Sequence, residues 1–402
     1  MNGMDKTILV INCGSSSVKF ALLHPTTGQA YLTGLAEKLG LRDALISFRY
    51  NDGTQSRHPL AQADHDSALH TLVTKLAELK LIETIAAIGH RIVHGGEHFS
   101  TSIQIDEKVL TDITRCSRLA PLHNPSHIMG IRCAQTHFPS LPQVAVFDTA
   151  FHQTLPERAY LYAIPTSLYQ EHAVRRYGFH GTSYRYISLI AAKMLNKPLE
   201  SIALIGAHLG NGASAAAILG GQSIDTTMGL TPLEGLVMGT RSGDVDPGLF
   251  SYLSTVMGLT IQEITDLLNQ RSGLLGLSGL SNDCRELEEA AQQGHQGARL
   301  ALDIFCYRLA KAIAALTVPL GRLDALVFTG GIGENSSWIR QHVVAMLGFL
   351  NLSLDSEANH QTVRGITGAI EQLGSIPILV INTNEEAMIA HDTATLIGLT
   401  PP

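Results

Sequence analysis

The sequence NCGSSSVKF at residues 12–20 says most about how this chain folds. It lies between two apolar runs, ILVI before it and ALL after it. The pattern predicts two strands, over residues 7–13 and 18–24, joined by a tight polar turn in which Gly14 lets the backbone bend sharply. A hairpin with a serine-rich turn therefore stands near the start of the fold.

The same turn carries groups that can bind phosphate. Its serines supply hydroxyl and N–H groups at one place, and Lys19 adds a positive charge beside them. Backbone turns of this kind cradle phosphate groups, and the amide oxygen of Asn12 suits a metal ion. An ordinary hairpin with polar turn residues explains this segment alone equally well, so the choice depends on the rest of the chain.

Length and composition describe a globular protein of two or three domains. The 402 residues are enough for an ample core, and 45% of them are apolar while 16% are charged. The formal net charge is −7, and no long block of Lys or Arg occurs. Non-specific binding to nucleic acid needs many cationic side chains to neutralise phosphates, so this function class is disfavoured.

Segments for export or membrane insertion are not expected. The apolar run before Asn12 is too short for the core of a signal peptide, and no stretch approaches the roughly 20 apolar residues of a membrane span. The five cysteines are scattered, odd in number and without a Cys-x-x-Cys pair. This usage favours free thiols in a reducing cytoplasm over a disulfide framework or a zinc site.

Further apolar patterns extend the fold beyond the hairpin. Apolar side chains at helical spacing predict a helix over residues 67–80. Strands are expected over residues 44–50, 85–88 and 143–147. Asp148 follows the last of these strands directly, and ligands gather at the carboxyl ends of strands in open α/β sheets. Asp148 is therefore a candidate site residue.

The opening pattern recurs in the second half of the chain. An apolar run at residues 202–206 leads into HLGNGAS at residues 208–214 and then into a second apolar run at residues 215–219. Two copies of one strand–turn–strand unit predict a duplicated architecture with a site between the halves. A boundary is expected near residues 148–156, and a helix over residues 385–399 is expected to pack back on the first half.

A third glycine-rich turn lies at residues 326–335, LVFTGGIGEN. A strand runs into the glycines, and a helix is expected over residues 336–347. Such an entry to a helix suits an anionic or nucleotide ligand, because free N–H groups and the helix dipole favour negative charge. The spacing Gly-x-x-x-x-Gly-Lys-Ser/Thr occurs nowhere in the chain, which disfavours a P-loop enzyme.

Two arginines lie in glycine-rich segments and not in charged runs. Arg91 belongs to GHRIVHGG, and Arg241 belongs to GTRSGD. A guanidinium group captures a carboxylate or a phosphate through two parallel hydrogen bonds. A structural salt bridge is the alternative for each arginine, but two of them in a chain with three phosphate-type turns favour a binding role.

The 18 histidines include two series that recur every four residues: His90, His94 and His98, and His123 and His127. Glycines interrupt the first series and Pro125 interrupts the second, so a helical zinc site is disfavoured. His180 differs because glycines flank it in YGFHGTS and allow a ligand to approach closely. A hydrogen-bonded core histidine is the alternative for His180.

Asp148 and Glu385 are the acidic candidates for a divalent cation. Glu385 follows the apolar residues LVI at 379–381 and the polar residues NTN at 382–384. Magnesium takes oxygen ligands and keeps several waters, so one carboxylate with an amide and phosphate oxygens suffices. The alternatives are a strand-end cap for Asp148 and a helix N-terminal charge for Glu385.

In combination these segments resemble the acetate and propionate kinase family over essentially the whole chain. The matching residues are 12–19, 89–96, 121–125, 147–152, 176–183, 208–212, 228–246, 328–335 and 383–386. The resemblance implies the actin, Hsp70 and sugar-kinase superfold, an α/β fold in which two duplicated domains, with mixed sheets flanked by helices, clamp a nucleotide in a cleft. The first domain would comprise residues 1–148 and 386–402, with the phosphate turn and the acyl substrate. The second, residues 149–385, would bind the nucleotide and dimerise.

The resemblance also implies a reaction. Members of the family form homodimers and transfer a phosphoryl group reversibly between ATP and a short-chain carboxylate, with Mg²⁺ or in its place Mn²⁺. With acetate the products would be acetyl phosphate and ADP. Asn12 and Glu385 match the family's Mg²⁺ positions. The residues that match its nucleotide-binding positions are Lys19, His208, Leu209, Gly210, Asn211, Gly212, Asp283, Cys284, Arg285, Gly331, Ile332, Gly333, Glu334 and Asn335.

Four residues match the family's catalytic positions. Arg91 and Arg241 correspond to the arginines that bind the carboxylate and the transferred phosphoryl group. His180 corresponds to the residue that stabilises the transition state, and Asp148 to the residue usually called the catalytic acid or base. A carboxylic acid has a pKa of roughly 4, so the nucleophile is already ionised at pH 7 and no proton needs removing. We therefore expect Asp148 to orient Arg91 or a metal-bound water.

The residues that the resemblance places around the acyl group are Val93, Leu122, His123, Phe179 and Pro232. Val93 is bulky where an alanine would leave room for another carbon, so acetate is expected to be preferred over propionate. Propionate kinase, with the same mechanism and a roomier pocket, is the nearest alternative. A nucleotide-controlled binding protein of the Hsp70 or actin kind would leave both arginines and His180 unexplained.

Overall fold

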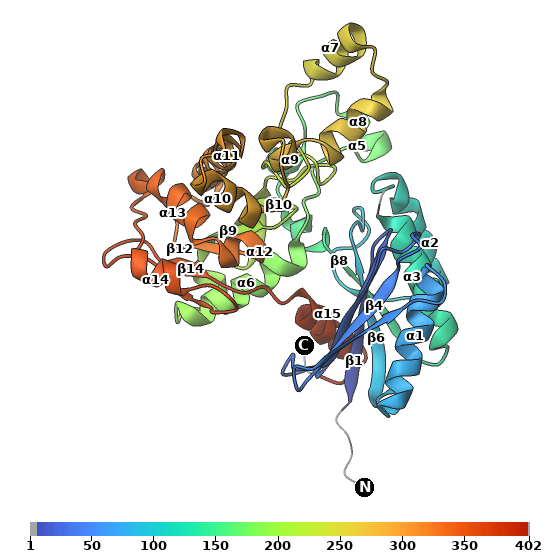
Figure 1. Cartoon of the computed structure of the whole chain (residues 1–402). Coiled ribbons are helices and arrows are strands. Elements are labelled where there is room, and N and C mark those ends of the chain that lie inside the picture. The colour runs from blue at the N-terminus through green and yellow to red at the C-terminus, as the bar shows by residue number, and fades with distance from the viewer. Residues whose placement is uncertain (1–5, 122, 401–402) are drawn as a thin grey trace. The chain divides into compact units, whose positions relative to one another are not determined.

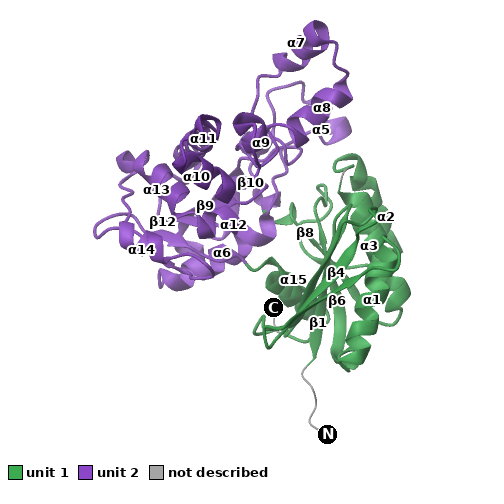
Figure 2. Cartoon of the chain, in the orientation of Figure 1, with its two compact units in different colours: residues 1–151, 384–402 green, residues 152–383 purple. Residues whose placement is uncertain are grey.

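The computed structural model describes residues 6–121 and 123–400, and the chain forms two compact units (Figure 1 and Figure 2). Unit 1 takes in the chain up to residue 151 and from residue 384 onward, and unit 2 is residues 152–383. These boundaries differ by a few residues from the expected limits at 148 and 385. Glu385 belongs to unit 1 because it begins the last helix, which packs on the sheet of that unit.

Unit 1 is built around an eight-stranded mixed sheet. Its strands are β1 (Thr7–Cys13), β2 (Ser17–Leu23), β3 (Ala30–Glu37), β4 (Leu45–Tyr50), β5 (Gln55–Pro59), β6 (Ile85–Ile92), β7 (Ile103–Gln104) and β8 (Gln143–Phe147). They lie in the order β5-β4-β3-β2-β1-β6-β8-β7, and β6 runs parallel to both β1 and β8. The predicted hairpin is confirmed as the antiparallel pair β1–β2.

The parallel strands bring residues from distant parts of the chain to one edge of this sheet. Ile11 lies opposite His90 in the pairing of β1 with β6, so the next residues, Asn12 and Arg91, lie side by side at the ends of their strands. Asp148 follows β8, and its backbone N–H donates to the last residue of β6. The carboxyl ends of β1, β6 and β8 therefore present Asn12, Arg91 and Asp148 together, as the position of Asp148 predicted.

Helices cover both faces of the sheet (Figure 1). They are α1 (His65–Glu78), α2 (Glu107–Arg115), α3 (Asn124–His137) and α15 (Glu385–Leu396). Because side chains alternate along a strand, Leu9 and Ile11 of β1 join a core with α1 and α3. Ile8 and Val10 point the other way and pack against α15. The predicted return of the C-terminal helix to the first half is confirmed.

The helix α1 shows how local sequence sets an element. The carboxylate of Asp64 accepts a hydrogen bond from the backbone N–H of Ser67 at 2.8 Å, which caps the free N-terminus. Leu69, Leu72 and Leu76 are buried at helical spacing. The helix predicted over residues 67–80 therefore exists, and it starts at His65 because the cap lies just before that residue.

Unit 2 repeats the plan of unit 1 with a six-stranded sheet. Its strands are β9 (Ala203–Leu209), β10 (Ala213–Leu219), β11 (Gln222–Thr226), β12 (Ala325–Thr329), β13 (Gly368–Ala369) and β14 (Ile378–Val380), in the order β11-β10-β9-β12-β14-β13. β9 pairs antiparallel with β10 and parallel with β12, which pairs parallel with β14. β9 and β10 thus take the places of β1 and β2, and the predicted duplication is confirmed.

Besides its sheet, unit 2 contains α-helices. They are α4 (Glu157–Tyr160), α5 (Ser167–His172), α6 (Gly181–Met194), α7 (Gly248–Met257), α8 (Ile261–Gln270), α9 (Gly273–Ser278), α10 (Cys284–Gln292), α11 (Gln296–Leu320), α12 (Gly330–Asn335), α13 (Ser337–Ala345) and α14 (Ser356–Gln361). The glycines after β12 wind into α12 themselves, and the helix predicted over residues 336–347 is α13, which Ser336 caps. No helix within residues 6–121 and 123–400 combines the length and apolar composition that a bilayer span requires.

Candidate active site

In unit 1, Arg91 and Asp148 form a two-pronged ion pair. Nε of Arg91 donates to Oδ1 of Asp148 at 3.0 Å, and Nη2 donates to Oδ2 at 2.7 Å. Only 2% of Asp148 is exposed. Burial opposes the charged guanidinium, but the carboxylates of Asp148 and Glu385 outweigh it and raise the pKa of Arg91. The two hydrogen bonds fix the plane of the Arg91 guanidinium and leave its Nη1 out of the ion pair. Asp148 is therefore placed to orient Arg91.

The N-terminus of α15 adds two carboxylates to the same edge. Oε2 of Glu385 lies 4.0 Å from Nε of Arg91, and Glu386 forms an ion pair with Lys19. Lys19 lies opposite Asn12 in the pairing of β2 with β1. Although burial favours the neutral acid, Lys19 lowers the pKa of Glu386. The sequence did not single out Glu386, because a second acidic residue in the first turn of a helix is an ordinary feature.

The oxygen ligands at this edge of the first sheet fit a hard cation. Asn12 offers an amide oxygen and Glu385 a carboxylate, which are ligand types that Mg²⁺ accepts. Within the described residues, no group of three or more His, Cys, Asp or Glu side chains is arranged to hold a metal ion. A cation at this edge would therefore depend on phosphate oxygens and water for most of its ligands, as Mg²⁺ commonly does in kinases.

Of the acyl-site candidates in unit 1, Val93 is half-buried just beyond β6 and His123 stands at the N-cap position of α3. The side chain of Asn124 fixes the main chain after Val93, since it accepts from the backbone N–H of His94 at 3.3 Å and donates to the carbonyl of His94 at 2.9 Å. Leu122 lies outside the described residues.

Three histidines of these series, His90, His94 and His127, are buried in unit 1. Burial lowers the pKa of His90 to about 4 and that of His127 to about 3. Both rings are therefore neutral at pH 7.

In unit 2, Arg241 and His180 face one point above Gly212. A Cβ atom placed on Gly212 would lie 3.4 Å from Nη2 of Arg241 and 3.5 Å from Nε2 of His180. The missing side chain thus leaves a space bordered by a guanidinium and an imidazole. Both groups can donate hydrogen bonds to an anionic oxygen. The glycine of the second turn is needed for this approach, and not only for the bend of the chain.

Arg241 has no carboxylate partner in the described part of the chain. Its Nη1 donates to the carbonyl of Pro232 at 2.8 Å and contacts the sulfur of Met238 at 3.5 Å. Burial lowers the pKa of Arg241 because no acidic side chain compensates for it. A half-buried cation without a counter-ion favours an anionic ligand. The structural salt bridge considered for Arg241 is therefore wrong, whereas for Arg91 it exists.

His180 is held in a constrained backbone conformation. Its φ angle is 60°, in the left-handed region that few residues other than glycine adopt, and Gly178 has φ 76°. The imidazole stacks on that of His208, with ring centroids 4.2 Å apart. Nδ1 of His180 lies 2.9 Å from Oγ of Ser214, and Nδ1 of His208 lies 2.8 Å from Oγ of Ser183. Such strain at a polar site is typical of a preorganised functional residue.

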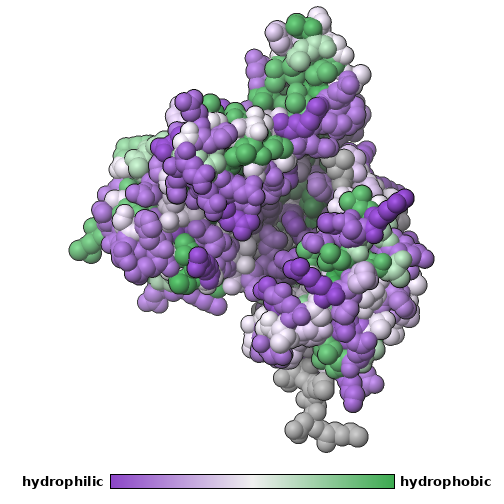
Figure 3. Space-filling view, in the orientation of Figure 1, coloured by the Kyte–Doolittle hydropathy of each residue, from purple (hydrophilic) through white to green (hydrophobic). Residues whose placement is uncertain are grey.

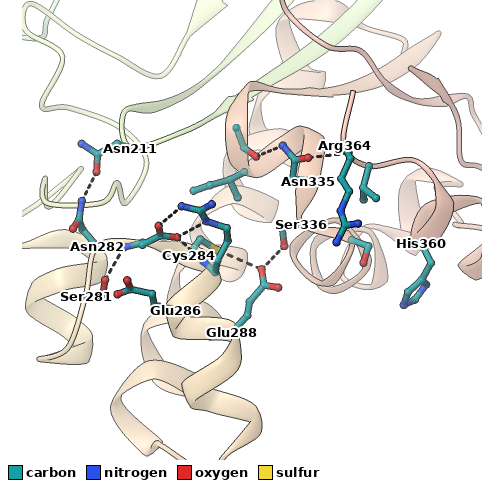
Figure 4. Close-up of a pocket in the computed structure, with 16 residues that line it drawn as sticks. Asn211, Ser281, Asn282, Cys284, Glu286, Glu288, Asn335, Ser336, His360 and Arg364 are labelled. Atoms are coloured by element: carbon teal, nitrogen blue, oxygen red, sulfur yellow. Dashed lines mark hydrogen bonds and ion pairs between the residues drawn. The ribbon is translucent and has the colours of Figure 1, made fainter. Parts of the chain in front are cut away.

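A cavity of about 1160 Å³ lies within unit 2 (Figure 4). The predicted nucleotide residues that line it are Asn211, Asp283, Cys284, Arg285, Gly331, Ile332 and Asn335. Its other lining residues, which the sequence did not mark, are Ser281, Asn282, Glu286, Glu288, Ser336, Ser337, His360, Val363 and Arg364. This volume is sufficient for a nucleoside.

The remaining nucleotide candidates lie elsewhere. Lys19 belongs to unit 1, and six others do not line the cavity, namely His208, Leu209, Gly210, Gly212, Gly333 and Glu334. The carboxylate of Glu334 turns inward, where Oε1 accepts from the backbone N–H groups of Gly330 at 2.9 Å and of Thr383 at 3.0 Å. Glu334 therefore fixes the loop instead of facing the cavity.

Hydrogen bonds hold the cavity wall in place. Asp283 caps α10 and also binds the guanidinium of Arg285, with Oδ2 of Asp283 2.6 Å from Nη2. Nδ2 of Asn282 donates to Oδ1 of Asn211 at 3.0 Å (Figure 4). This bond joins the segment before α10 to the turn between β9 and β10. Burial and the neighbouring Glu288 raise the pKa of Cys284. The thiol is therefore no nucleophile, and Cys284 contributes packing.

Arg340 is a buried residue that sequence reasoning missed. It is 0% exposed, and its Nη1 donates to the carbonyls of Gly333 at 2.9 Å and Glu334 at 3.0 Å. Its other nitrogens donate to the side chain and carbonyl of Asn359 and to the carbonyl of Thr362. Burial lowers the pKa of Arg340 to about 10. This guanidinium joins α12 to the segment after α14, and both flank the cavity.

The two sheets of like topology, each opening on a polar hairpin turn with cationic side chains nearby, define a duplicated fold of the actin, Hsp70 and sugar-kinase class. The chain matches the model of the Acetokinase family over residues 7–391. It therefore belongs to the acetokinase family.

Individual relatives agree with this membership. The chain is 61% identical over 396 residues to the acetate kinase of Chromobacterium violaceum, with 98% of this chain and 100% of that protein covered. A propionate kinase from Francisella tularensis subsp. tularensis SCHU S4 has a TM-score of 0.94 at 48% identity, covering 97% of this chain and 100% of that one. The acetate kinase of Porphyromonas gingivalis has a TM-score of 0.92 at 42% identity, covering 98% and 100%.

Proposed function

We propose that this chain transfers a phosphoryl group reversibly between ATP and acetate, giving acetyl phosphate and ADP. The observation that carries the proposal is the convergence of Arg241 and His180 on the space above Gly212. A guanidinium without a counter-ion and an imidazole that share one space are suited to the oxygens of a migrating phosphoryl group. The 61% identity to the acetate kinase of Chromobacterium violaceum gives independent support.

The proposed reaction is a direct in-line displacement. A carboxylate oxygen of acetate attacks the γ-phosphorus of ATP while the bond to ADP breaks on the opposite side, and charge spreads over three equatorial oxygens. Arg241 and His180 donate to these oxygens, and Arg91 binds the carboxylate or the phosphoryl group. Because the attacking acid is already ionised at pH 7, no residue has to remove a proton. Asp148 holds Arg91 and is not needed as an acid or a base.

We assign the metal and the nucleotide to the residues that suit them. Asn12 and Glu385 would hold Mg²⁺, or Mn²⁺ in its place, and the bound ion would offset the charge of the phosphates. The cavity bordered by Asp283, Arg285 and Gly331 would take the nucleoside of ATP, and His208 to Gly212 would contact its phosphates. Unit 1 would therefore carry the acyl substrate and unit 2 the nucleotide.

We propose a homodimer in a cytoplasmic setting, with unit 2 as the dimerising part. Apolar side chains gather on α7 and α8, where Tyr252, Val256, Met257 and Ile261 are exposed. Figure 3 shows a green, hydrophobic patch over α7. An exposed apolar patch of this kind suits a second copy of the chain. A single monomeric species in light scattering at micromolar concentration would contradict the proposal.

Trapping of the acyl phosphate tests the activity itself. With ATP and a divalent cation, acetate is expected to give hydroxylamine-reactive product faster than propionate, and propionate faster than butyrate. A chain that hydrolyses ATP without any dependence on carboxylate would overturn the proposal. A kcat/KM higher for propionate than for acetate would instead favour a propionate kinase, like the structurally similar Francisella tularensis protein.

Replacing Val93 by alanine is expected to raise the activity on propionate relative to acetate severalfold. The methyl groups removed from this half-buried side chain leave room for one more carbon, and one methylene is worth about 1–3 kcal/mol in an apolar site. The measurement is kcat/KM for both acids in the wild type and in Val93→Ala. Ile103→Ala, in the same unit, is the control and is expected to leave the ratio of kcat/KM for propionate to that for acetate unchanged. The same ratio in Val93→Ala as in the wild type would show that Val93 does not set the size of acyl group that is accepted.

A further inference from the structure

We propose that Tyr184 and Ser214 are positioning residues for His180, whose hydroxyl groups form a relay that keeps the proton of the imidazole on Nε2. The relay decides which ring nitrogen offers an N–H group to the space above Gly212. The inference rests on the function proposed above, in which His180 donates to the transferred phosphoryl group. Tyr184 and Ser214 act only through His180.

The relay consists of two short contacts among three residues. Oγ of Ser214, in β10, lies 2.9 Å from Nδ1 of His180, which stands just before α6. The hydroxyl of Tyr184, in α6, lies 2.6 Å from the same Oγ. Tyr184 and Ser214 are both 0% exposed. Water therefore does not compete for these hydroxyls, and each bond in the relay constrains the next.

The proposed direction of proton donation along the relay starts at the hydroxyl of Tyr184. The backbone N–H of His208 hydrogen-bonds the hydroxyl oxygen of Tyr184, so this oxygen is an acceptor there. Burial raises the pKa of Tyr184, and the phenol keeps its proton at neutral pH. In the proposed relay, that proton points to Oγ of Ser214, which in turn directs its own proton to Nδ1 of His180. A neutral imidazole that accepts at Nδ1 carries its proton at Nε2.

The backbone around His180 and its stacking on His208 also restrict the position of the ring. His152 contacts the carbonyl of Phe179, the residue before His180, with Nε2 at 2.9 Å from that oxygen. His180 itself has a φ angle of 60°, and its ring stacks on His208. The backbone therefore fixes where the imidazole lies, while the hydroxyl relay fixes which of its two nitrogens carries the proton.

The tautomer matters because Nε2 is the nitrogen that faces the reaction space. Nε2 lies 3.5 Å from the Cβ position of Gly212, beside Nη2 of Arg241. With the proton on Nε2, His180 and Arg241 present two donors to one anionic group. With the proton on Nδ1, a lone pair would face the phosphoryl oxygens and repel them. The relay thus converts a neutral ring into a preorganised donor.

Single substitutions measure the relay in the complete protein. Ser214→Ala is expected to lower kcat by about 10- to 100-fold, by analogy with groups that orient metal-binding histidines, with little change in KM for ATP. Tyr184→Phe removes one oxygen, keeps the ring packing, and is expected to lower kcat by about tenfold or less. Ser188→Ala is the matched control. Ser188 is buried in α6, and its hydroxyl donates to the backbone carbonyl of Tyr184. Ser188→Ala is expected to keep near-wild-type kcat.

Two further measurements separate positioning from a general structural effect. In a His180→Ala background, Ser214→Ala is expected to cause no additional loss of kcat, because the relay then has nothing to orient. Nitrogen-15 chemical shifts of the His180 ring are expected to show protonated Nε2 in the wild type and a mixture of tautomers in Tyr184→Phe and Ser214→Ala.

Three results would overturn the proposal. They are a proton on Nδ1 in the wild type, equal losses of kcat for Ser214→Ala with and without His180, or losses in Ser188→Ala as large as those in Ser214→Ala. The nitrogen-15 shifts need no turnover. If the wild type phosphorylated no carboxylate, the proposed function would fail while the shifts still decided the relay.

Discussion

Replacing Arg241 by alanine is expected to lower kcat by about a thousandfold or more, by analogy with arginine fingers in phosphoryl transfer. Arg241 is the cation of unit 2 that borders the space above Gly212, and no described carboxylate neutralises it. Its charge is therefore available to the transition state, where negative charge spreads over the phosphoryl oxygens. The loss is expected in kcat more than in KM for ATP, because the nucleoside cavity is lined by other residues.

The controls distinguish charge from geometry. Arg241→Lys keeps the charge but loses the planar pair of donors, and it is expected to recover only part of the rate. Arg322→Ala removes an exposed arginine of unit 2 that pairs with Asp324, and it is expected to be neutral. Gly212→Ala would place a methyl group 3.4 Å from Nη2 of Arg241 and is expected to block the same step without removing a charge. A near-normal kcat in Arg241→Ala would refute the assignment.

Replacing Arg91 by alanine is expected to cost about a thousandfold or more in kcat and also to destabilise unit 1. The variant removes the guanidinium at the edge of the first sheet and leaves the carboxylate of Asp148 buried without its partner. Breaking one side of a buried ion pair costs about 3–5 kcal/mol. The measurements are kcat by acyl phosphate trapping and the free energy of unfolding by urea titration.

The surface offers a matched control for this pair. Arg132 binds Glu107 through two hydrogen bonds in the same unit, at 2.6 and 2.9 Å, but both side chains are largely exposed. Arg132→Ala is expected to change stability by about 1 kcal/mol or less and to leave kcat unchanged. Equal destabilisation by the two variants would show that burial of the Arg91–Asp148 pair has no special effect.

Asp148→Asn tests whether Asp148 acts through Arg91. The amide keeps the shape but loses the charge that holds the guanidinium, so a partial loss of kcat is expected. In an Arg91→Ala background the same substitution is expected to add little, because both changes affect one interaction. Loss of an ionisation that the wild type shows in its pH–rate profile would count against an orienting role and for acid or base catalysis.

Local sequence was sufficient for elements whose signal is contained in a few neighbouring residues. The hairpin around Gly14, the helix that Asp64 caps and the buried strand before Asp148 were all predicted from periodicity and turn residues. The duplication was also readable, because each half repeats a strand, a polar turn and a strand. The long helix α11 went unmarked, since its apolar residues surround much of the helix and blur the helical period.

The amino-acid sequence by itself thus determined which types of group are present: arginines in glycine-rich turns, a histidine between glycines, and carboxylates at strand and helix ends. Only tertiary structure decided how these groups are used. Parallel strand pairing joins Arg91 to Asp148 across 57 positions, and the inward turn of Glu334 removes it from the cavity. Ser214, in β10, reaches His180, which precedes α6. The physical reason is that hydrogen bonds and ion pairs depend on distances of about 3 Å, and the separation of two residues along the chain does not fix their distance in space.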